Sequence, residues 1–510
     1  MTLAPVPAPS SITADPSAAA FPLTNGVRLT GEADAAVALA GLITARTSGA
    51  IVPGTAEEGP GAGGAIDLRI APGGRAESYR IAVDAASVIV TGADAAGLFY
   101  GVLTIAQLIR REGEGFVVPS VRIDDVPRFA YRGVMLDVAR HFLPVETVKA
   151  YIDRAASLKF NALHLHLSDD QGWRIHLDSR PELTELASST AVGGDAGGFY
   201  AKADYREIVA FAASRHMIVV PEIDLPGHTH AVGLAYPQLA EEPVLSPHIL
   251  EIVDAHGGPI PAAGEPYTGM GVGFSSLRIH EEATYDFVAD VVGELAGMTP
   301  GPYLHIGGDE ALGTTPEDFA LFMERATAIV ADLGKTPITW HEAGAAARID
   351  PSTVGQYWGF TIPTDGMDEE ARTFVSNDAG LILSPADAVY LDMKYDAHTP
   401  LGLTWANGPT SVERAYSWEP VAVIEGLTDA DILGVEAPMW TETIRTLDDI
   451  DVMAFPRIAA AAEAAWSPPF AESDLRTWPS FRARVGALGP LWSSLGIRFH
   501  PSDEIAWVSE

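Results

Sequence analysis

"YLHIGGDEAL", residues 303–312, is the stretch around which the rest of the sequence can be ordered. It begins as a mostly apolar run of the kind that forms a buried strand, and two adjacent carboxylates, Asp309 and Glu310, follow two glycines. Neighbouring residues of a strand point to opposite faces. The two carboxylates can therefore share one site only if the chain leaves strand geometry at Gly307 and Gly308. Glycine permits this departure, and we predict it.

This stretch is one of eight mostly apolar segments, which span residues 132–139, 161–169, 217–225, 303–310, 336–343, 352–359, 380–386 and 431–440. Helical patterns lie between most of them, for example at residues 144–159, 205–216, 317–334 and 449–466. Near-continuous apolar strands that alternate with helices indicate a parallel sheet covered by helices. We therefore predict an α/β fold, a (β/α)8 TIM barrel over residues 127–505, with its site at the C-terminal ends of the strands.

The residues before the barrel have a different pattern. Short alternating segments and one helical pattern over residues 27–126 predict a small α+β domain that precedes the barrel. Residues 1–26 are rich in Pro, Ser and Ala, and we predict a flexible lead-in there.

The composition narrows the class of function. The net charge of −36 argues against nucleic acid and anionic membranes as partners, since both would repel the protein. The absence of cysteine excludes disulfides, thiolate nucleophiles and zinc–thiolate sites. The sequence has no apolar run long enough to span a bilayer, and its first 23 residues contain no Lys or Arg, unlike a secretory signal. We expect a cytoplasmic location, or secretion if a signal has been removed.

Polar and aromatic residues gather at the ends of the predicted strands. The strand ends read "DVARHF", "HLSDDQGW", "PEIDLPGHTH", "GGDEA", "WHEA", "QYWG" and "EAPMWTE", and "YLDMKY" follows the seventh strand. Tryptophans stack on the apolar faces of sugar rings, while Arg, Asp and Glu bind their hydroxyls. This inventory indicates a carbohydrate site.

The combined motifs "LHIGGDEA", "DVARHF", "HLHLSDDQGWR", "PEIDLPGHT", "WTE" and "YLDMKY" resemble those of the β-N-acetylhexosaminidases of glycoside hydrolase family 20, of the bacterial type. The resemblance extends through all eight strand ends. It implies a retaining exo-enzyme that releases terminal non-reducing GlcNAc or GalNAc. The nucleophile would be the substrate's own 2-acetamido group, which forms an oxazolinium intermediate, and this is an exception to the usual two-carboxylate scheme.

The resemblance also implies roles for single residues. Glu310 would be the general acid/base, and Asp309 would hold the acetamido N–H and stabilise its positive charge. His228 and Asp169 would couple to the acid, and Tyr390 would donate a hydrogen bond to the attacking carbonyl oxygen.

The remaining predicted site residues contact the sugar or support the acid pair. Trp340, Trp358 and Trp440 would form the walls of the acetamido pocket, and Trp405 would line the leaving-group side. The sugar hydroxyls would be bound by Arg140, Asp392 and Glu442. Asp224 would support Asp309 from behind. No cofactor or metal is implied, and we expect a monomer or homodimer. Residues 241–266 match no motif and follow the third strand, where they can shape the rim near the leaving group.

Two alternatives stay open. His164 and His166 lie two apart on one strand and face the same way, which with "GHTH" suggests a metal-dependent barrel of the amidohydrolase type. That type carries its histidine pair on the first strand, so we expect these two histidines to be structural residues of the barrel interior. The other alternative is a catalytically silent sugar-binding barrel, which turnover of an aryl N-acetyl-β-glucosaminide would exclude.

Overall fold

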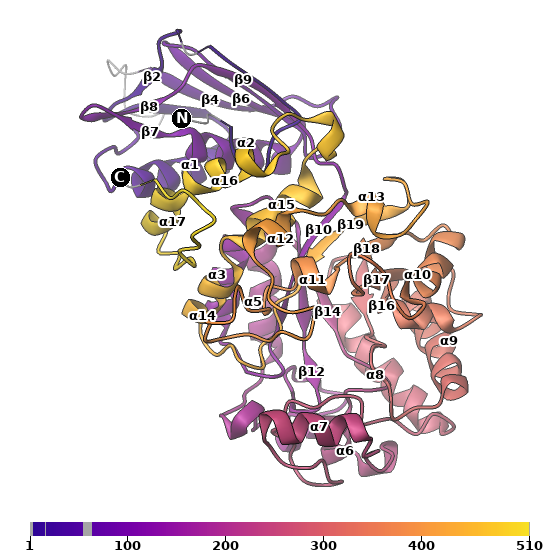
Figure 1. Cartoon of the computed structure of the whole chain (residues 1–510). Coiled ribbons are helices and arrows are strands. Elements are labelled where there is room, and N and C mark those ends of the chain that lie inside the picture. Colours follow the sequence, from indigo (N-terminus) through magenta and orange to yellow (C-terminus); the bar gives the residue numbers. More distant parts are fainter. Residues whose placement is uncertain (1–3, 16, 55–63, 509–510) are drawn as a thin grey trace. The chain divides into compact units, whose positions relative to one another are not determined.

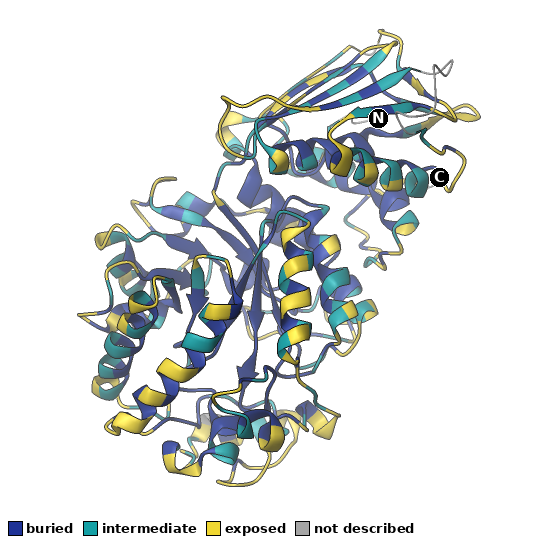
Figure 2. Cartoon of the chain, turned by 180° about the vertical axis from the view of Figure 1, so that it is seen from behind, coloured by how far each residue is buried: buried dark blue, intermediate teal, exposed yellow. Residues whose placement is uncertain are grey.

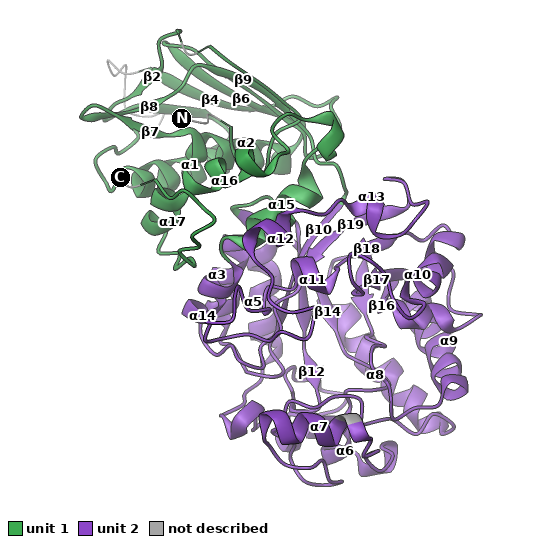
Figure 3. Ribbon diagram, viewed as in Figure 1, with its two compact units in different colours: residues 1–130, 157–159, 455–510 green, residues 131–156, 160–454 purple. Residues whose placement is uncertain are grey.

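The computed structural model describes residues 4–15, 17–54 and 64–508. The chain divides into two compact units, each described here by itself. Unit 1 contains residues 1–130, 157–159 and 455–510, and unit 2 contains residues 131–156 and 160–454 (Figure 3).

Eight parallel strands close into a barrel in unit 2, in the order β10 (Tyr131–Asp137), β11 (Ala162–His166), β14 (Ile218–Glu222), β15 (Tyr303–His305), β16 (Thr336–Trp340), β17 (Val354–Tyr357), β18 (Leu381–Leu383) and β19 (Ile432–Ala437) (Figure 1). Each lies within one of the eight predicted segments or begins one residue before it. The prediction of a (β/α)8 barrel is confirmed.

The longer helices of unit 2 are α3 (Val145–Ala156), α5 (Lys202–Ala213), α8 (Glu282–Met298), α9 (Pro316–Asp332), α10 (Met367–Ser376) and α14 (Leu447–Ala454). In α3 the buried residues recur at helical spacing: Val148, Tyr151, Ile152, Ala155 and Ala156. Helix α9 begins where the Thr315 side chain accepts a hydrogen bond from the backbone N–H of Asp318, with proline at the first position. Each helix therefore buries one stripe and exposes the other, as Figure 2 shows.

The barrel interior is layered because alternate residues of a strand point inward. One layer is apolar and contains Tyr131, Ala162, Val220, Ile338, Val354 and Ile382. Two residues further along these strands come His164, Glu222, Trp340 and Gln356, all fully buried. The change from apolar to polar marks the beginning of the functional end of the barrel.

Shorter elements connect the barrel strands. They are β12 (Ser168–Asp169), β13 (Gly172–Trp173), α4 (Glu182–Ala187), η1 (Val192–Gly194), α6 (His230–Ala235), η2 (Pro237–Leu239), α7 (Pro247–His256), η3 (His341–Ala345), α11 (Ala386–Val389), α12 (Val412–Tyr416) and α13 (Pro420–Val423). The motif-free segment 241–266 contains α7, which packs through Ile249 on Tyr267 and Phe274. None of the described helices is long and apolar enough to cross a membrane.

Unit 1 is built on a mixed sheet of six strands, in the order β1 (Ser11–Ala14), β9 (Val121–Asp125), β5 (Tyr79–Val83), β6 (Ser87–Gly92), β4 (Ala65–Ile70) and β3 (Arg28–Gly31). A second sheet has the order β2 (Phe21–Leu23), β8 (Gly115–Val118) and β7 (Arg110–Glu112). The helices of this unit are α1 (Ala33–Arg46), α2 (Ala95–Leu108), α15 (Arg457–Trp466), η4 (Phe470–Glu472), α16 (Trp478–Gly486) and α17 (Gly489–Ser494).

Two predicted boundaries differ from this arrangement. The lead-in over residues 1–26 is not flexible where the structure describes it, because β1 pairs with β9, and Val6 and Ala8 are fully buried. The barrel unit ends at residue 454 and not at 505, since residues 455–510 pack with the N-terminal unit. The helical pattern of residues 449–466 is divided into α14 and α15 at Pro456, which cannot continue a helix from within.

A buried ion pair explains why both ends of the chain belong to unit 1. Arg484 binds Glu463 through two hydrogen bonds of 2.7 and 2.6 Å. Glu463 also accepts a hydrogen bond of 3.0 Å from the backbone N–H of Ala8, and Arg484 donates one of 2.9 Å to the carbonyl of Pro5. The N-terminal segment is thereby fixed to two C-terminal helices.

Replacing Glu463 with alanine should lower the free energy of unfolding by about 3–5 kcal/mol, because the Arg484 charge would stay buried without its carboxylate. Chemical denaturation of the full chain measures this. The control is Glu282→Ala, which removes an exposed pair with Arg325 and should cost less than about 1 kcal/mol. Equal denaturation midpoints for the two variants would contradict the assignment.

Candidate functional site

The two predicted catalytic carboxylates follow a break in strand geometry. Strand β15 ends at His305, and φ is positive at Gly307 (67°), Gly308 (104°) and Glu310 (44°). The predicted departure at the two glycines is confirmed. Close approach also requires glycine at 307, because a Cβ there would lie 1.7 Å from Asp224 Oδ1.

The turn brings Asp309 and Glu310 to one place. Polar atoms of these two residues and of His228 all lie within 4.8 Å of one another. Burial and then the charge of Asp309 raise the pKa of Glu310 to about 7. Glu310 is therefore about half protonated at pH 7, so the acid form that a general acid needs is well populated there.

Asp224 supports Asp309 from behind. Burial and then the charge of Asp309 hold the pKa of Asp224 well above its usual range, and a hydrogen bond joins the two side chains. Asp224 Oδ1 also accepts a hydrogen bond of 3.1 Å from the backbone N–H of Gly308, which ties the carboxyl to the turn.

His228, Asp169 and Arg140 form a connected set beside the acid. His228 follows β14 with φ of 53°; its Nε2 lies 3.9 Å from Asp309 Oδ2, and its Nδ1 lies 3.2 Å from Asp169 Oδ1. Asp169 Oδ2 forms an ion pair with Arg140, whose Nη2 lies 2.7 Å away. Burial lowers the pKa of His228, but Asp169, Asp224 and Asp309 outweigh it and raise that pKa well above its usual value. His228 is therefore cationic.

Aromatic rings form the wall of the site. Trp340, Tyr390 and Trp440 are buried together, with Trp358 packed against them. The Trp340 and Trp440 ring centroids are 6.1 Å apart, and Tyr390 lies 6.4 Å from Trp440. Burial and then the charge of Asp309 raise the pKa of Tyr390 well above its ordinary value, so its hydroxyl remains a donor. Trp405 is 47% exposed and lies edge-on to both Trp358 and Tyr390, at the outer margin of the wall.

The two remaining predicted acids belong to the same electrostatic environment. Asp392 is buried, and its charge contributes to the raised pKa of Tyr390. Glu442 has a raised pKa, first because of burial and despite the charge of Arg140. The structure thus brings all thirteen predicted residues to the C-terminal end of the barrel.

Sequence reasoning missed two acids of the site. Glu342 accepts hydrogen bonds of 2.9 and 3.0 Å from the indole N–H of Trp358. Glu222 accepts one of 3.0 Å from the indole N–H of Trp340. Each acid fixes one wall of the aromatic pocket. Both acids stand at strand ends, in "WHEA" and "PEID", and this position could have identified them as site residues from the sequence.

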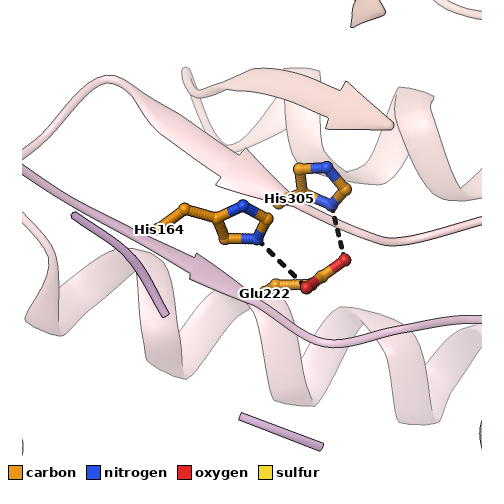
Figure 4. A group of neighbouring side chains, drawn as sticks. All are labelled: His164, Glu222 and His305. Atoms are coloured by element: carbon orange, nitrogen blue, oxygen red, sulfur yellow. Dashed lines mark hydrogen bonds and ion pairs between the residues drawn. The ribbon is translucent and has the colours of Figure 1, made fainter. Parts of the chain in front are cut away.

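Ligand-type side chains in the barrel interior raise the question of a metal. His164, Glu222 and His305 offer atoms within 4.8 Å of one another (Figure 4). His164 Nδ1 lies 2.9 Å from Glu436 Oε1, and its Nε2 lies 3.0 Å from Glu222 Oε2. Burial lowers the pKa of His164, but the two carboxylates raise it to about 10. His164 is thus held by hydrogen bonds to two carboxylates, whereas His305 Nδ1 accepts a hydrogen bond of 3.0 Å from the backbone N–H of Gly307.

Two family models match the chain. The model described as "Glycosyl hydrolase family 20, catalytic domain" matches residues 129–469, and "Glycosyl hydrolase family 20, domain 2" matches residues 4–126. The chain belongs to glycosyl hydrolase family 20. It is therefore a glycoside hydrolase, and the resemblance seen in its motifs is confirmed.

Individual relatives agree with the family. A β-N-acetylhexosaminidase of Cellulomonas fimi is 41% identical over 476 residues, which cover 92% of this chain and 89% of the relative. A solved family 20 β-N-acetylglucosaminidase superposes with a TM-score of 0.92 at 66% identity, covering 99% of this chain and 100% of that chain. A mutant β-hexosaminidase of Streptomyces plicatus in complex with the product GlcNAc has a TM-score of 0.87 at 44% identity, covering 99% of this chain and 97% of that chain.

Replacing Gly307 with alanine should lower kcat/KM on the order of 100-fold, because the new methyl group would displace Asp224 and with it the acid pair. The matched control is Gly334→Ala, which imposes similar strain at φ of 74° but meets no atom within 4 Å. Steady-state kinetics together with thermal unfolding separate misplacement from lost stability. If both variants kept wild-type kcat/KM, the close approach would not matter for the reaction.

The pKa of Glu310 predicts the pH dependence. The acid form must be present, so kcat/KM should fall about tenfold per pH unit once the pH rises above about 7. An aryl N-acetyl-β-glucosaminide with a poor leaving group reports this alkaline limb. Glu310→Gln, assayed with a strongly activated aryl glycoside that needs no acid, should lack it. A variant that retained the limb would show that another group titrates there.

Proposed function

We propose that this family 20 hydrolase is a retaining exo-β-N-acetylhexosaminidase that works by substrate-assisted catalysis through an oxazolinium intermediate. Its substrates would be oligosaccharides and glycoconjugates with terminal non-reducing GlcNAc or GalNAc. The names of the Cellulomonas and Streptomyces relatives, and the GlcNAc product held by the latter, support a hexosaminide substrate.

The proposal rests on the different surroundings of two adjacent carboxyl groups, those of Asp309 and Glu310. Glu310 has a pKa raised to about 7, which suits a proton donor. Asp309 lies 3.9 Å from the cationic His228 and shares a hydrogen bond with Asp224, whose pKa is held well above its usual range, and it is 7% exposed. A carboxylate held from behind by these two groups is better suited to accept a hydrogen bond from a substrate N–H than to attack carbon.

The first step would break the glycosidic bond. The carbonyl oxygen of the acetamido group attacks the anomeric carbon, while Glu310 transfers its proton to the leaving oxygen and keeps the electron pair of its O–H bond. The product is an oxazolinium ion with positive charge on its N–H. Asp309 accepts a hydrogen bond from that N–H and stabilises the charge, and an ion pair in so enclosed a site is stronger than in water.

The second step would reverse the proton transfer. The Glu310 carboxylate takes a proton from water as the water oxygen attacks the anomeric carbon, and the oxazolinium ring opens to regenerate the acetamido group. Two displacements on the same carbon retain its configuration. Because the nucleophile belongs to the substrate, the enzyme forms no covalent glycosyl intermediate.

The aromatic wall would hold the nucleophile. Tyr390 stays protonated and can donate its hydroxyl to the acetamido carbonyl oxygen. Trp340, Trp358 and Trp440 would surround the methyl group and hold the carbonyl oxygen near the anomeric carbon. The sugar hydroxyls and the leaving group would be bound by Arg140, Asp392, Glu442 and Trp405.

Replacing Asp309 with asparagine should lower kcat/KM for an aryl N-acetyl-β-glucosaminide on the order of 100-fold, because the charge that stabilises the oxazolinium N–H is lost. Steady-state kinetics measure this, and the surface variant Asp153→Asn is the control. A thiazoline analogue of the intermediate should inhibit the wild type strongly and the Asp309 variant weakly. Wild-type rate in Asp309→Asn would rule out the substrate-assisted step.

A further inference from the structure

His166 and His228 both contact the Asp169 carboxylate, but the reaction as written does not use His166. We propose that His166 is a positioning residue, which fixes the Asp169 carboxylate and thereby holds Arg140 and His228 in their working places. The proposal deepens the proposed function and rests on it.

Both ring nitrogens of His166 are engaged. The side chain is fully buried at the end of β11; its Nε2 lies 2.9 Å from Asp169 Oδ2, and its Nδ1 bonds Glu222 Oε2. Burial lowers the pKa of His166, but Glu222 and Asp169 raise it to about 9. The ring is therefore an imidazolium that donates to a carboxylate on each side, and it cannot turn without breaking a bond.

Asp169 connects the fixed His166 ring to the residues of the functional site. Its Oδ2 accepts a hydrogen bond from His166 and forms an ion pair with Arg140, and its carboxylate faces His228 Nδ1 at 3.2 Å. Arg140 would bind the sugar hydroxyls, whereas His228 lies beside the acid pair. The orientation of the Asp169 carboxylate therefore determines where Arg140, which would bind the sugar, lies relative to His228, which lies beside the acid pair.

Glu222 anchors the other end. Its Oε2 bonds His164 at 3.0 Å and His166, and its Oε1 lies 2.9 Å from His305 Nδ1 and accepts a hydrogen bond of 3.0 Å from Trp340 Nε1. Figure 4 shows the carboxylate between His164 and His305. Because residues of strands β11, β15 and β16 all contact it, the Glu222 carboxylate is held in one position and gives His166 a fixed partner.

The ring also packs directly on the pocket. Its centroid lies 4.9 Å from that of Trp440, with an interplanar angle of 74°. The Arg140 guanidinium carbon lies 4.7 Å from the same tryptophan ring. His166, Arg140 and Trp440 thus form one packed group. Movement of the His166 ring would therefore displace both Arg140 and the Trp440 wall of the acetamido pocket.

His164 provides a matched control. Both histidines lie on β11, are fully buried and bond the same oxygen of Glu222, yet His166 alone of the two bonds Asp169. In place of His166, glutamine can put its N–H₂ near the Nε2 position and keep the bond to Asp169. The shorter asparagine reaches only the Nδ1 position, which keeps the bond to Glu222.

The experiment compares asparagine and glutamine at positions 166 and 164 by kinetics, thermal unfolding and calorimetric binding of N-acetylglucosamine. His166→Asn should lower kcat/KM on the order of 10- to 100-fold, with kcat reduced and KM and the Kd for N-acetylglucosamine raised. His166→Gln should recover most of this loss. The His164 variants should lose comparable stability but keep kcat/KM within about threefold. Equal activity of the two His166 variants, or equal losses at 164 and 166, would overturn the proposal.

A double-mutant cycle with Asp169→Asn keeps the test decisive if His166→Asn does not fold. Because His166 acts through Asp169, His166→Phe, which keeps a ring but forms neither hydrogen bond, should change kcat/KM less in the Asp169→Asn background than in the wild type. Additive losses would overturn the proposal. Turnover of the aryl glycoside by the wild type tests the proposed function separately, so the two failures are distinguishable.

Discussion

The functional end of the barrel depends on the balance of charges that are buried together. Asp169, Glu222 and Glu436 are inaccessible carboxylates, and each lies beside cationic Arg140 or a histidine. An unpaired buried ion costs several kcal/mol, so removing one member leaves its neighbour uncompensated. Opposite charges therefore hold these side chains together, and Arg140 and His228 take their positions from the part of the set around Asp169.

This arrangement follows from the two-residue period of the strands. The same strands that supply the apolar layer at Ala162, Val220 and Val354 supply His164, Glu222 and Gln356 one inward position later. The strand pairing that builds the apolar layer therefore also brings the charged side chains together. The aromatic wall at the top of the interior is then fixed from below, through the bond from Trp340 to Glu222.

The strand pattern and the strand-end motifs were predictable because a barrel brings all C-terminal strand ends to one rim, whatever their distance in sequence. Gly307 and Gly308 were informative because few other residues reach their φ values. The order of the N-terminal segment was not predictable, since Ala8 is held by Glu463, 455 residues away. Likewise, the four contacts of Glu222 come from three other strands, and no local pattern specifies such a set.

Glu310 has φ of 44°, a conformation that a glutamate adopts only at a cost of about 1–2 kcal/mol. Glycine would occupy the same backbone without that cost. At this position stability and activity therefore favour different residues. A population of variants selected for thermal resistance alone would drift away from glutamate here, and only continued selection for turnover keeps the acid in the sequence.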